Sequence, residues 1–182
     1  MRRHLAYAAG AAALALAGCG GDDPTPQVAD PTPSASVSAS PSASAAVEKE
    51  AWEKKTDDGA VAFVEHWLEV FNEAETTGKT QALEDLSAPG CETCANFVEI
   101  TNGVYQAGGF IKSNGWKVQQ VGNPTETATE TVVALNVEQT PQRVRETAEG
   151  ETLSRPGGML SLSAHLVWRD GKWVMNRLDR VT

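Results

Sequence analysis

The sequence lacks any hydrophobic run long enough to cross a membrane. Its longest apolar stretch, Leu5 to Leu16, has 12 residues, whereas a membrane-spanning helix needs roughly 20. The chain also has only three cysteines and three histidines, and it contains no Gly-x-Ser-x-Gly, Ser-x-x-Lys or His-Glu-x-x-His motif. These absences remove the sequence support for the hydrolase classes that use those motifs. We expect no catalytic residue, no metal and no cofactor.

The short apolar stretch has the pattern of an export signal. Arg2 and Arg3 precede it, and Leu16-Ala17-Gly18-Cys19 closes it. Its length fits the core of a signal peptide. The tetrapeptide resembles the bacterial lipobox, which implies a diacylglyceryl group on the Cys19 sulfur and cleavage before Cys19. We therefore expect residues 1–18 to be a lipoprotein signal peptide.

The acylated Cys19 would anchor the mature protein at the outer face of the bacterial cytoplasmic membrane, because two acyl chains hold a protein there stably. The alternative is an ordinary signal peptide with an incidental cysteine. The export route, general secretory or twin-arginine, is left open by the Arg pair.

Residues 19–47 are expected to be the lipidated cysteine followed by a disordered tether. From Gly20 to Val47 the chain is rich in Pro, Ser and Ala and contains no Leu, Ile or aromatic residue. Such a segment cannot bury enough apolar surface to offset its chain entropy. Its Ser and Thr residues among prolines leave O-glycosylation open.

The chain is acidic, with a formal net charge of −9. Loss of residues 1–18 removes two arginines and leaves −11, from 13 Lys and Arg against 24 Asp and Glu. An acidic protein is a poor candidate for binding nucleic acid or anionic lipid head groups. The partners we expect are the membrane, through the lipid on Cys19, and an envelope protein or a small apolar ligand.

Residues 48–182 are long enough for one domain with one core. Val64, Trp67, Leu68 and Phe71 recur at helical spacing and predict a helix that Asp57 or Asp58 caps and that Thr77-Gly78 ends. Further helices are expected over 81–86 and from about 92 to 106. Gly108-Gly109 is expected to break the third helix.

The second half of this domain has strand-like patterns. Strands are predicted over 116–121, 129–138, 160–168 and 172–181, and Asp170-Gly171 is a strong hairpin signal between the last two. The polar segment 142–154 is predicted to be an edge hairpin or irregular. Helices followed by antiparallel strands predict an α+β domain with its N-terminal helices packed on one face of a curved antiparallel sheet.

This order resembles the cystatin-like cone of the nuclear-transport-factor-two superfamily, in which the last strand often begins with a Gly-x-Trp turn, as at Gly171-Lys172-Trp173. A second resemblance rests on Asp58 to Phe63, on Cys91-Glu92-Thr93-Cys94 and on Trp116. These segments are similar to an actinobacterial lipoprotein family with a domain of unknown function. The family implies export, anchoring and a disulfide, and it brings no catalytic residues.

Cys91 and Cys94 stand at the start of the third predicted helix. Two cysteines at that spacing can form a disulfide, and export favours oxidation. Thiol–disulfide exchange is an alternative, although such a motif normally follows a strand. Reduced thiols or a metal remain further alternatives, but zinc would need two more ligands, and only His66 and His165 lie in the mature chain.

A set of aromatic residues could line a pocket inside the cone or simply fill the core: Trp67, Phe71, Tyr105, Trp116 and Trp168. An isomerase-like enzyme would need a carboxylate and a hydroxyl in that pocket. Tyr105 could supply the hydroxyl, but no carboxylate is expected on an inward face. His66 is expected to be solvated, and His165 to be exposed or at a protein contact.

We therefore expect a lipid-anchored cell-envelope protein that acts as a binding or scaffolding module. One alternative is a small-molecule-binding or isomerase-like cone domain. Another is a thiol–disulfide redox protein that uses Cys91 and Cys94. The ligand, the partner and the oligomeric state are not encoded in any motif of the chain.

Overall fold

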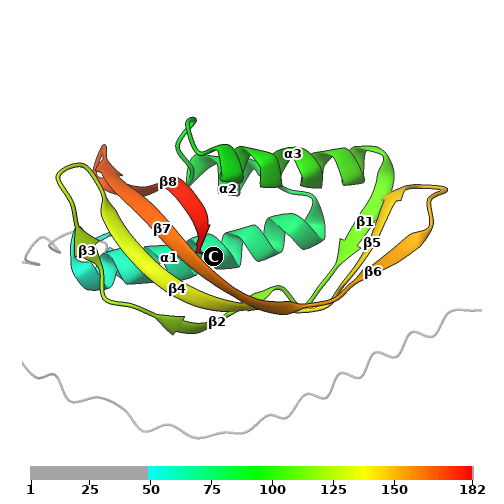
Figure 1. The fold of residues 1–182 in the computed structure, drawn as a ribbon. Coiled ribbons are helices and arrows are strands. Elements are labelled where there is room, and N and C mark those ends of the chain that lie inside the picture. Colours follow the sequence, from blue (N-terminus) through cyan, green and yellow to red (C-terminus); the bar gives the residue numbers. More distant parts are fainter. Residues whose placement is uncertain (1–48, 182) are drawn as a thin grey trace, which may run out of the picture. The chain divides into compact units, whose positions relative to one another are not determined.

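The computed structural model describes residues 49–181 (Figure 1). The predicted signal peptide, Cys19 and the tether lie outside these residues. The described elements are η1 (Ala51–Glu53), α1 (Asp57–Thr77), α2 (Gln81–Asp85), α3 (Glu92–Gln106), β1 (Gly108–Lys112), β2 (Trp116–Val121), β3 (Thr125–Glu126), β4 (Thr131–Gln139), β5 (Gln142–Thr147), β6 (Thr152–Arg155), β7 (Gly158–Arg169) and β8 (Lys172–Val181). The predicted α+β class, with helices before antiparallel strands, is confirmed.

Helix α1 forms where the apolar spacing predicts it. Thr56, and not Asp57 or Asp58, caps its N-terminus, because the Thr56 hydroxyl accepts a hydrogen bond from the Gly59 N–H at 3.0 Å. Gly78 ends the helix at a φ of 75°, a left-handed conformation that favours glycine. No helix among residues 49–181 is both long and apolar enough to cross a membrane.

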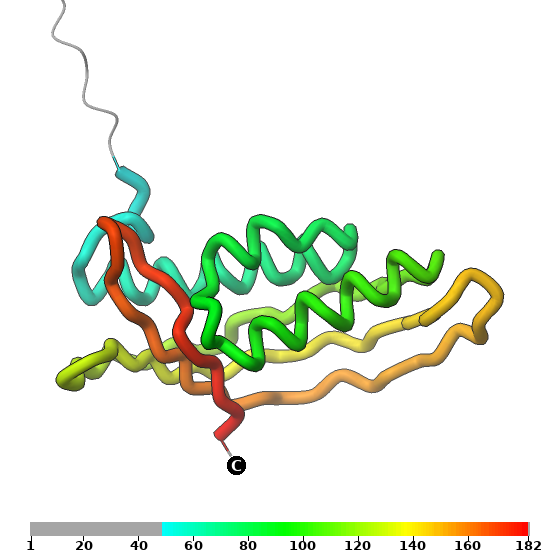
Figure 2. Tube along the Cα trace, turned by 90° about the horizontal axis from the view of Figure 1, so that it is seen from above, coloured from blue at the N-terminus to red at the C-terminus, as the bar shows by residue number. Residues whose placement is uncertain are grey.

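The larger sheet has the strand order β2-β4-β7-β8, with β3 also paired to β4. Asp170 and Gly171 join β7 to β8 with φ values of 51° and 78°, and a type I′ hairpin turn requires positive φ at both positions. Helices α1 and α3 lie side by side over one face of the strands (Figure 2). That face is lined by buried side chains of β4 and β7: Val133, Leu135, Val137, Leu162, Ala164 and Leu166.

The polar segment after β4 is a hairpin of β5 and β6, one of the two predicted alternatives. It belongs to a second sheet with the order β1-β5-β6. Strand β1 was not predicted, since Gly108-Gly109 was expected only to break α3. A Cβ atom at Gly109 would lie 2.1 Å from the carbonyl oxygen of Arg145 on β5. Glycine therefore permits the close approach through which β1 joins this sheet.

One long bent hairpin joins the two sheets. The pairing of β4 with β7 stops at Gln139, and the pairing of β5 with β6 begins at Gln142. Between these points lie Thr140-Pro141 on one side and Pro156-Gly157 on the other. Proline has no N–H to donate to a strand ladder, and a Cβ atom at Gly157 would lie 2.2 Å from the Gln139 carbonyl oxygen. The ribbon therefore bends here.

The bend also changes which residues of the ribbon are buried. On β4 the buried side chains are odd-numbered, ending at Val137, whereas on β5 they are the even-numbered Gln142 and Val144. This places a polar side chain, Gln142, on the face that packs toward the helices.

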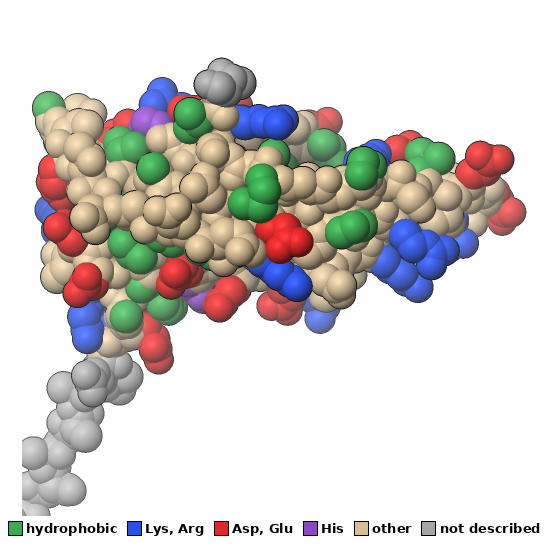
Figure 3. Space-filling view, turned by 60° about the horizontal axis from the view of Figure 1, so that its bottom comes forward, with side chains coloured by type: hydrophobic (Ala, Val, Ile, Leu, Met, Phe, Trp, Pro, Cys, Tyr) green, Lys and Arg blue, Asp and Glu red, His purple; other side chains and the backbone are tan. Residues whose placement is uncertain are grey.

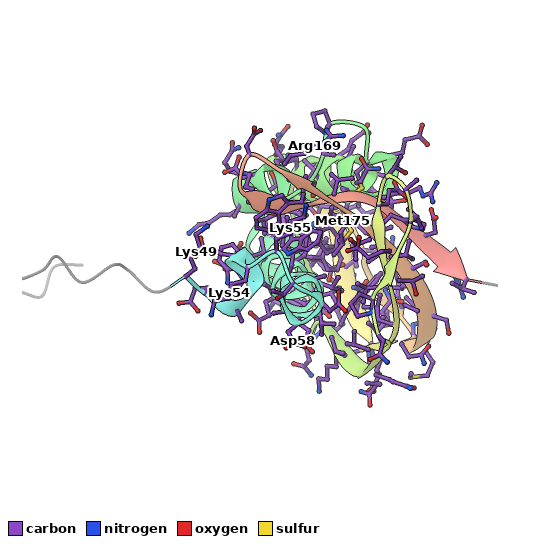
Figure 4. All side chains as sticks on the ribbon, turned by 90° about the vertical axis from the view of Figure 1, so that its left-hand side faces the viewer. Lys49, Lys54, Lys55, Asp58, Arg169 and Met175 are labelled. Atoms are coloured by element: carbon purple, nitrogen blue, oxygen red, sulfur yellow. A yellow bond between two sulfur atoms is a disulfide. The ribbon has the colours of Figure 1, made fainter. Side chains whose placement is uncertain are left out.

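Aromatic rings fill the space between α1, α3 and β2. The centroid of the Phe71 ring lies 4.7 Å from that of Phe97 and 5.0 Å from that of Trp116. Trp67 is fully buried, and its indole N–H donates to the Ser87 hydroxyl at 3.1 Å. Figure 4 looks at the domain end-on, with Met175 of β8 among packed side chains. Of the five aromatic residues predicted to line a pocket, Trp67 and Phe71 lie within one hydrophobic core, and Trp116 and Trp168 pack against it.

Cys91 and Cys94 form a disulfide at the start of α3, and each residue is 1% exposed. The Cys91 sulfur also accepts a hydrogen bond from the Cys94 N–H. The segment that precedes Cys91 is bound to β8 by two backbone hydrogen bonds. The N–H of Ala88 donates to the Met175 carbonyl, and the N–H of Met175 donates to the Leu86 carbonyl. The disulfide therefore fixes the entry of α3 beside β8.

Asn72 ties α1 to β2 through two hydrogen bonds to the backbone of Trp116, at 2.8 Å and 3.0 Å. Replacing Asn72 with Ala should lower the free energy of unfolding by about 1–3 kcal/mol, because the Trp116 N–H and carbonyl both lose their partner. Urea denaturation measures this change, with Glu73→Ala as the control on the exposed side of the same helix. Equal midpoints for the two variants would contradict the assigned role of Asn72.

Candidate functional site

A cavity of about 70 Å³ lies where α1 and α3 face the smaller sheet. Its apolar lining comes from both helices and both larger strands of that sheet: Phe71, Phe97, Ile100, Val104, Ile111 and Val144. Its polar lining consists of Glu75, Thr101, Gln142, Glu146 and Arg155. The cavity thus combines apolar walls with a small number of polar groups, which is typical of small-molecule sites.

Glu75 is the central polar residue of this cavity. One carboxylate oxygen, Oε1, accepts a hydrogen bond from the Gln142 side-chain N–H at 2.8 Å. The other, Oε2, is buried and has no hydrogen-bond partner among the described residues. Burial raises the pKa of Glu75 above its ordinary value, and the Gln142 hydrogen bond and the charge of Arg155 offset part of that rise. The site therefore holds a carboxyl group that needs a donor.

The expectation that no carboxylate lies on an inward face is wrong. Glu75 follows Phe71 by four residues, so it extends the apolar stripe of α1 by one further turn. That spacing alone could have predicted that Glu75 lies on the inward face of the helix. Gln142 and Arg155, by contrast, are brought to Glu75 by the bent hairpin, in which they are cross-strand partners, and no motif marks them.

The mouth of the cavity carries an ion pair and apolar side chains. Arg155 donates to Glu146 at 3.3 Å, and both side chains are more than half exposed. Ile100 lines the cavity and is 49% exposed. Leu153, which is 47% exposed, is the cross-strand partner of the lining residue Val144. A ligand could therefore meet both charge and apolar surface at the entrance.

Of the five aromatics predicted to line a pocket, Phe71 lines this cavity. Trp67 and Trp116 each pack their rings against Phe71. Trp168 packs against Trp173 with ring centroids 5.1 Å apart. The Tyr105 hydroxyl donates to backbone carbonyls at the end of α1, including that of Thr76. It is thus engaged in holding that helix end rather than facing the cavity.

The two described histidines lie elsewhere. His66 stacks on Trp52, with ring centroids 4.3 Å apart. His165 is only 12% exposed and lies between two carboxylates, 2.9 Å from Glu130 and 3.2 Å from Asp179, so the expectation that it is exposed is corrected. Burial alone would raise the pKa of Glu130, but hydrogen bonds from Asn176 and His165 outweigh burial and lower it.

The disulfide lies outside the residues that line this cavity. Cys91 and Cys94 are buried, which gives a partner thiol little access to either sulfur. Within residues 49–181, no group of three or more His, Cys, Asp or Glu side chains could hold a metal ion.

Solved structures show a similar fold. The intermembrane space region of the chloroplast protein ARC6 has a TM-score of 0.56 and 10% identity, over 71% of this chain and 98% of that one. An uncharacterised protein from Caulobacter vibrioides with a cystatin-like fold has a TM-score of 0.44 and 11% identity, over 68% and 91% of the two chains. A putative dehydratase of the NTF2-like family from Streptomyces avermitilis has a TM-score of 0.42 and 13% identity, over 68% of this chain and 96% of that one.

The similarity to the ARC6 region shows a shared fold and no activity. The other two chains are described as having a cystatin-like fold and as belonging to the NTF2-like family. No curated protein has a matching sequence. Residues 43–179, most of the chain, match the model of DUF6318, a family of unknown function. The chain therefore belongs to the DUF6318 family.

Proposed function

We propose that this protein is a lipid-anchored envelope protein whose folded domain binds a small ligand in the Glu75 cavity. The observation that carries the binding role is the buried Glu75 Oε2, which has no hydrogen-bond partner in the described part of the chain. A buried acceptor without a donor costs about 1–3 kcal/mol, and a ligand with an N–H or O–H group would remove that cost. The anchor rests on the lipobox at Cys19.

The size of the cavity limits what part of a ligand it takes. Pockets that enclose a whole drug-sized molecule have about 300–1,000 Å³, whereas this one has about 70 Å³. It fits a single amino or hydroxyl group. The apolar remainder of the ligand would lie at the mouth, against Ile100 and Leu153, which are both about half exposed. The ligand class is therefore a small amphiphile with a donor at one end.

Replacing Cys19 with Ala should move the protein from the membrane fraction to the soluble fraction, because it removes the sulfur that would carry the lipid. Cell fractionation and immunoblotting measure this, with Ser36→Ala in the same tether as the control. A Cys19→Ala protein that stays with the membrane would refute the anchor.

Replacing Glu75 with Gln should change how stability depends on pH. Because burial raises the pKa of Glu75 above 4.5 in the folded chain, the folded state binds more protons than the unfolded state between the two pKa values. Stability contributed at Glu75 therefore falls as pH rises through that window and stays low above it. The unfolding free energy of Glu75→Gln relative to wild type should rise over the same window.

Urea denaturation at intervals between about pH 4 and pH 8 measures this difference, a range that covers ordinary and raised carboxyl pKa values. Glu73→Gln is the matched control, since Glu73 is an exposed carboxylate two residues away. The same pH profile for Glu75→Gln and Glu73→Gln would show that burial does not perturb the Glu75 carboxyl.

The ligand class can be tested with n-hexylamine, which has a donor on an apolar chain. Titration of the full chain, followed by the NMR signal of the Gln142 side-chain amide, should show saturable binding. Glu75→Gln should weaken it about tenfold or more, because a hydrogen bond to a charged group contributes about 1.5–3 kcal/mol. Hexyltrimethylammonium, with the same chain and the same positive charge but no N–H, should not bind. Equal responses to both compounds would contradict the proposal.

A further inference from the structure

A second and larger concavity lies at the bend of the hairpin. It is an open hollow of about 760 Å³, and it shares Gln142 and Arg155 with the Glu75 cavity. Three cations line it, Lys112, Arg143 and Arg155, together with the polar residues Ser113, Asn114 and Ser154. Its volume is within the range of small-molecule sites.

The charge of this hollow is opposite to that of the chain. The chain has a formal charge of −9, yet no carboxylate is among the described residues that line the hollow. Lys112 and Arg143 make no ion pair within residues 49–181. They are also direct cross-strand partners, and like charges in that position destabilise a sheet. A bound anion would relieve this repulsion.

The cationic surface continues beyond the hollow along β5. Arg145 follows Arg143 by two residues, so it lies on the same face of the strand, about 7 Å further along. Its guanidinium lies 4.7 Å from the centroid of the Phe110 ring, and the Lys112 ammonium lies 5.0 Å from the same centroid. The Arg145 Nε is buried without a hydrogen-bond partner in the described structure. Figure 3 shows basic side chains gathered over β5 and β6.

Hydroxyl groups accompany these cations in register. Ser154 on β6 is the cross-strand partner of Arg143, and Thr152 is the partner of Arg145. Each arginine thus has a hydroxyl donor beside it on the same face. A guanidinium fork with a neighbouring hydroxyl provides several donors to the oxygens of one phosphate. The pair Arg143 and Ser154 lies about two residues along the strands from the pair Arg145 and Thr152. This spacing would suit two successive phosphate groups of one ligand.

We propose that the hollow and the adjoining face of β5 and β6 bind one ligand with two or more phosphate groups. One phosphate is held in the hollow by Lys112, Arg143 and Ser154, and the next is held beyond it by Arg145 and Thr152. The proposal does not rest on the Glu75 site, since none of these five residues lines that cavity. The ligand class is an oligophosphate in solution. Free phosphate should bind more weakly, because it occupies one position at a time.

The test is calorimetric titration of the full chain with tripolyphosphate at an ionic strength of about 0.15 M, at which charges farther apart than about 8 Å are largely screened. The double variant Lys112→Gln/Arg143→Gln should weaken binding about tenfold or more, since it removes two charge-assisted contacts. The control is Lys117→Gln/Arg180→Gln, which changes net charge equally at two exposed cations outside the hollow. The control should bind within about twofold of wild type, because only the net charge differs.

Three results would overturn the proposal. These are no binding of tripolyphosphate, equal weakening in the two double variants, and binding to phosphatidylglycerol vesicles but not to tripolyphosphate. The first excludes the ligand class, the second reduces the effect to net charge, and the third assigns the surface to the membrane. The variant Lys112→Gln/Arg143→Gln should bind n-hexylamine within about twofold of wild type, because neither residue lines the Glu75 cavity. A failure at the Glu75 cavity and a failure here are therefore distinguishable.

Discussion

The bend in the long hairpin is the constraint on which both concavities depend. Two residues on each strand, Thr140-Pro141 and Pro156-Gly157, interrupt the ladder. The buried Thr140 hydroxyl donates to the Gly115 carbonyl at 2.9 Å and accepts from the Asn114 N–H at 3.1 Å, so it fixes the bend against the loop before β2. An unbroken ribbon would keep one set of residues on the inward face along its whole length. The interruption instead turns Gln142 toward the helices.

Gln142 and Arg155 form the first pair after the bend and line both the small cavity and the open hollow. Arg155 contacts Glu146 at 3.3 Å, and its charge also offsets part of the rise that burial causes in the pKa of Glu75. One cation therefore serves the electrostatics of both concavities. Because electrostatic interactions are stronger away from bulk water, a change in the surroundings of Arg155 affects the partly buried Glu75 more than an exposed carboxylate.

Periodicity predicts the regular elements well and the site poorly. The bounds of α3, β2 and β8 follow from apolar spacing and turn residues. Strand β1 was missed because its pairing depends on β5, a tertiary contact that overrides the usual effect of two glycines. No carboxylate was expected on an inward face, although the distance of four residues from Phe71 places Glu75 on the buried stripe of α1. The meeting of Gln142 with Glu75 depends on strand register and a bend, which no local pattern encodes.

Two local features of this domain oppose its own stability. One is a buried carboxylate with an oxygen left without a donor, and the other is a pair of like charges opposite each other on neighbouring strands. A glutamine or an apolar residue at 75, or an acidic residue opposite Arg143, would cost less. Residues that break such rules concentrate where a protein binds or reacts. Here they lie at two concavities that share one residue pair, and each would be relieved by a ligand of the complementary chemistry, a donor in one and an anion in the other.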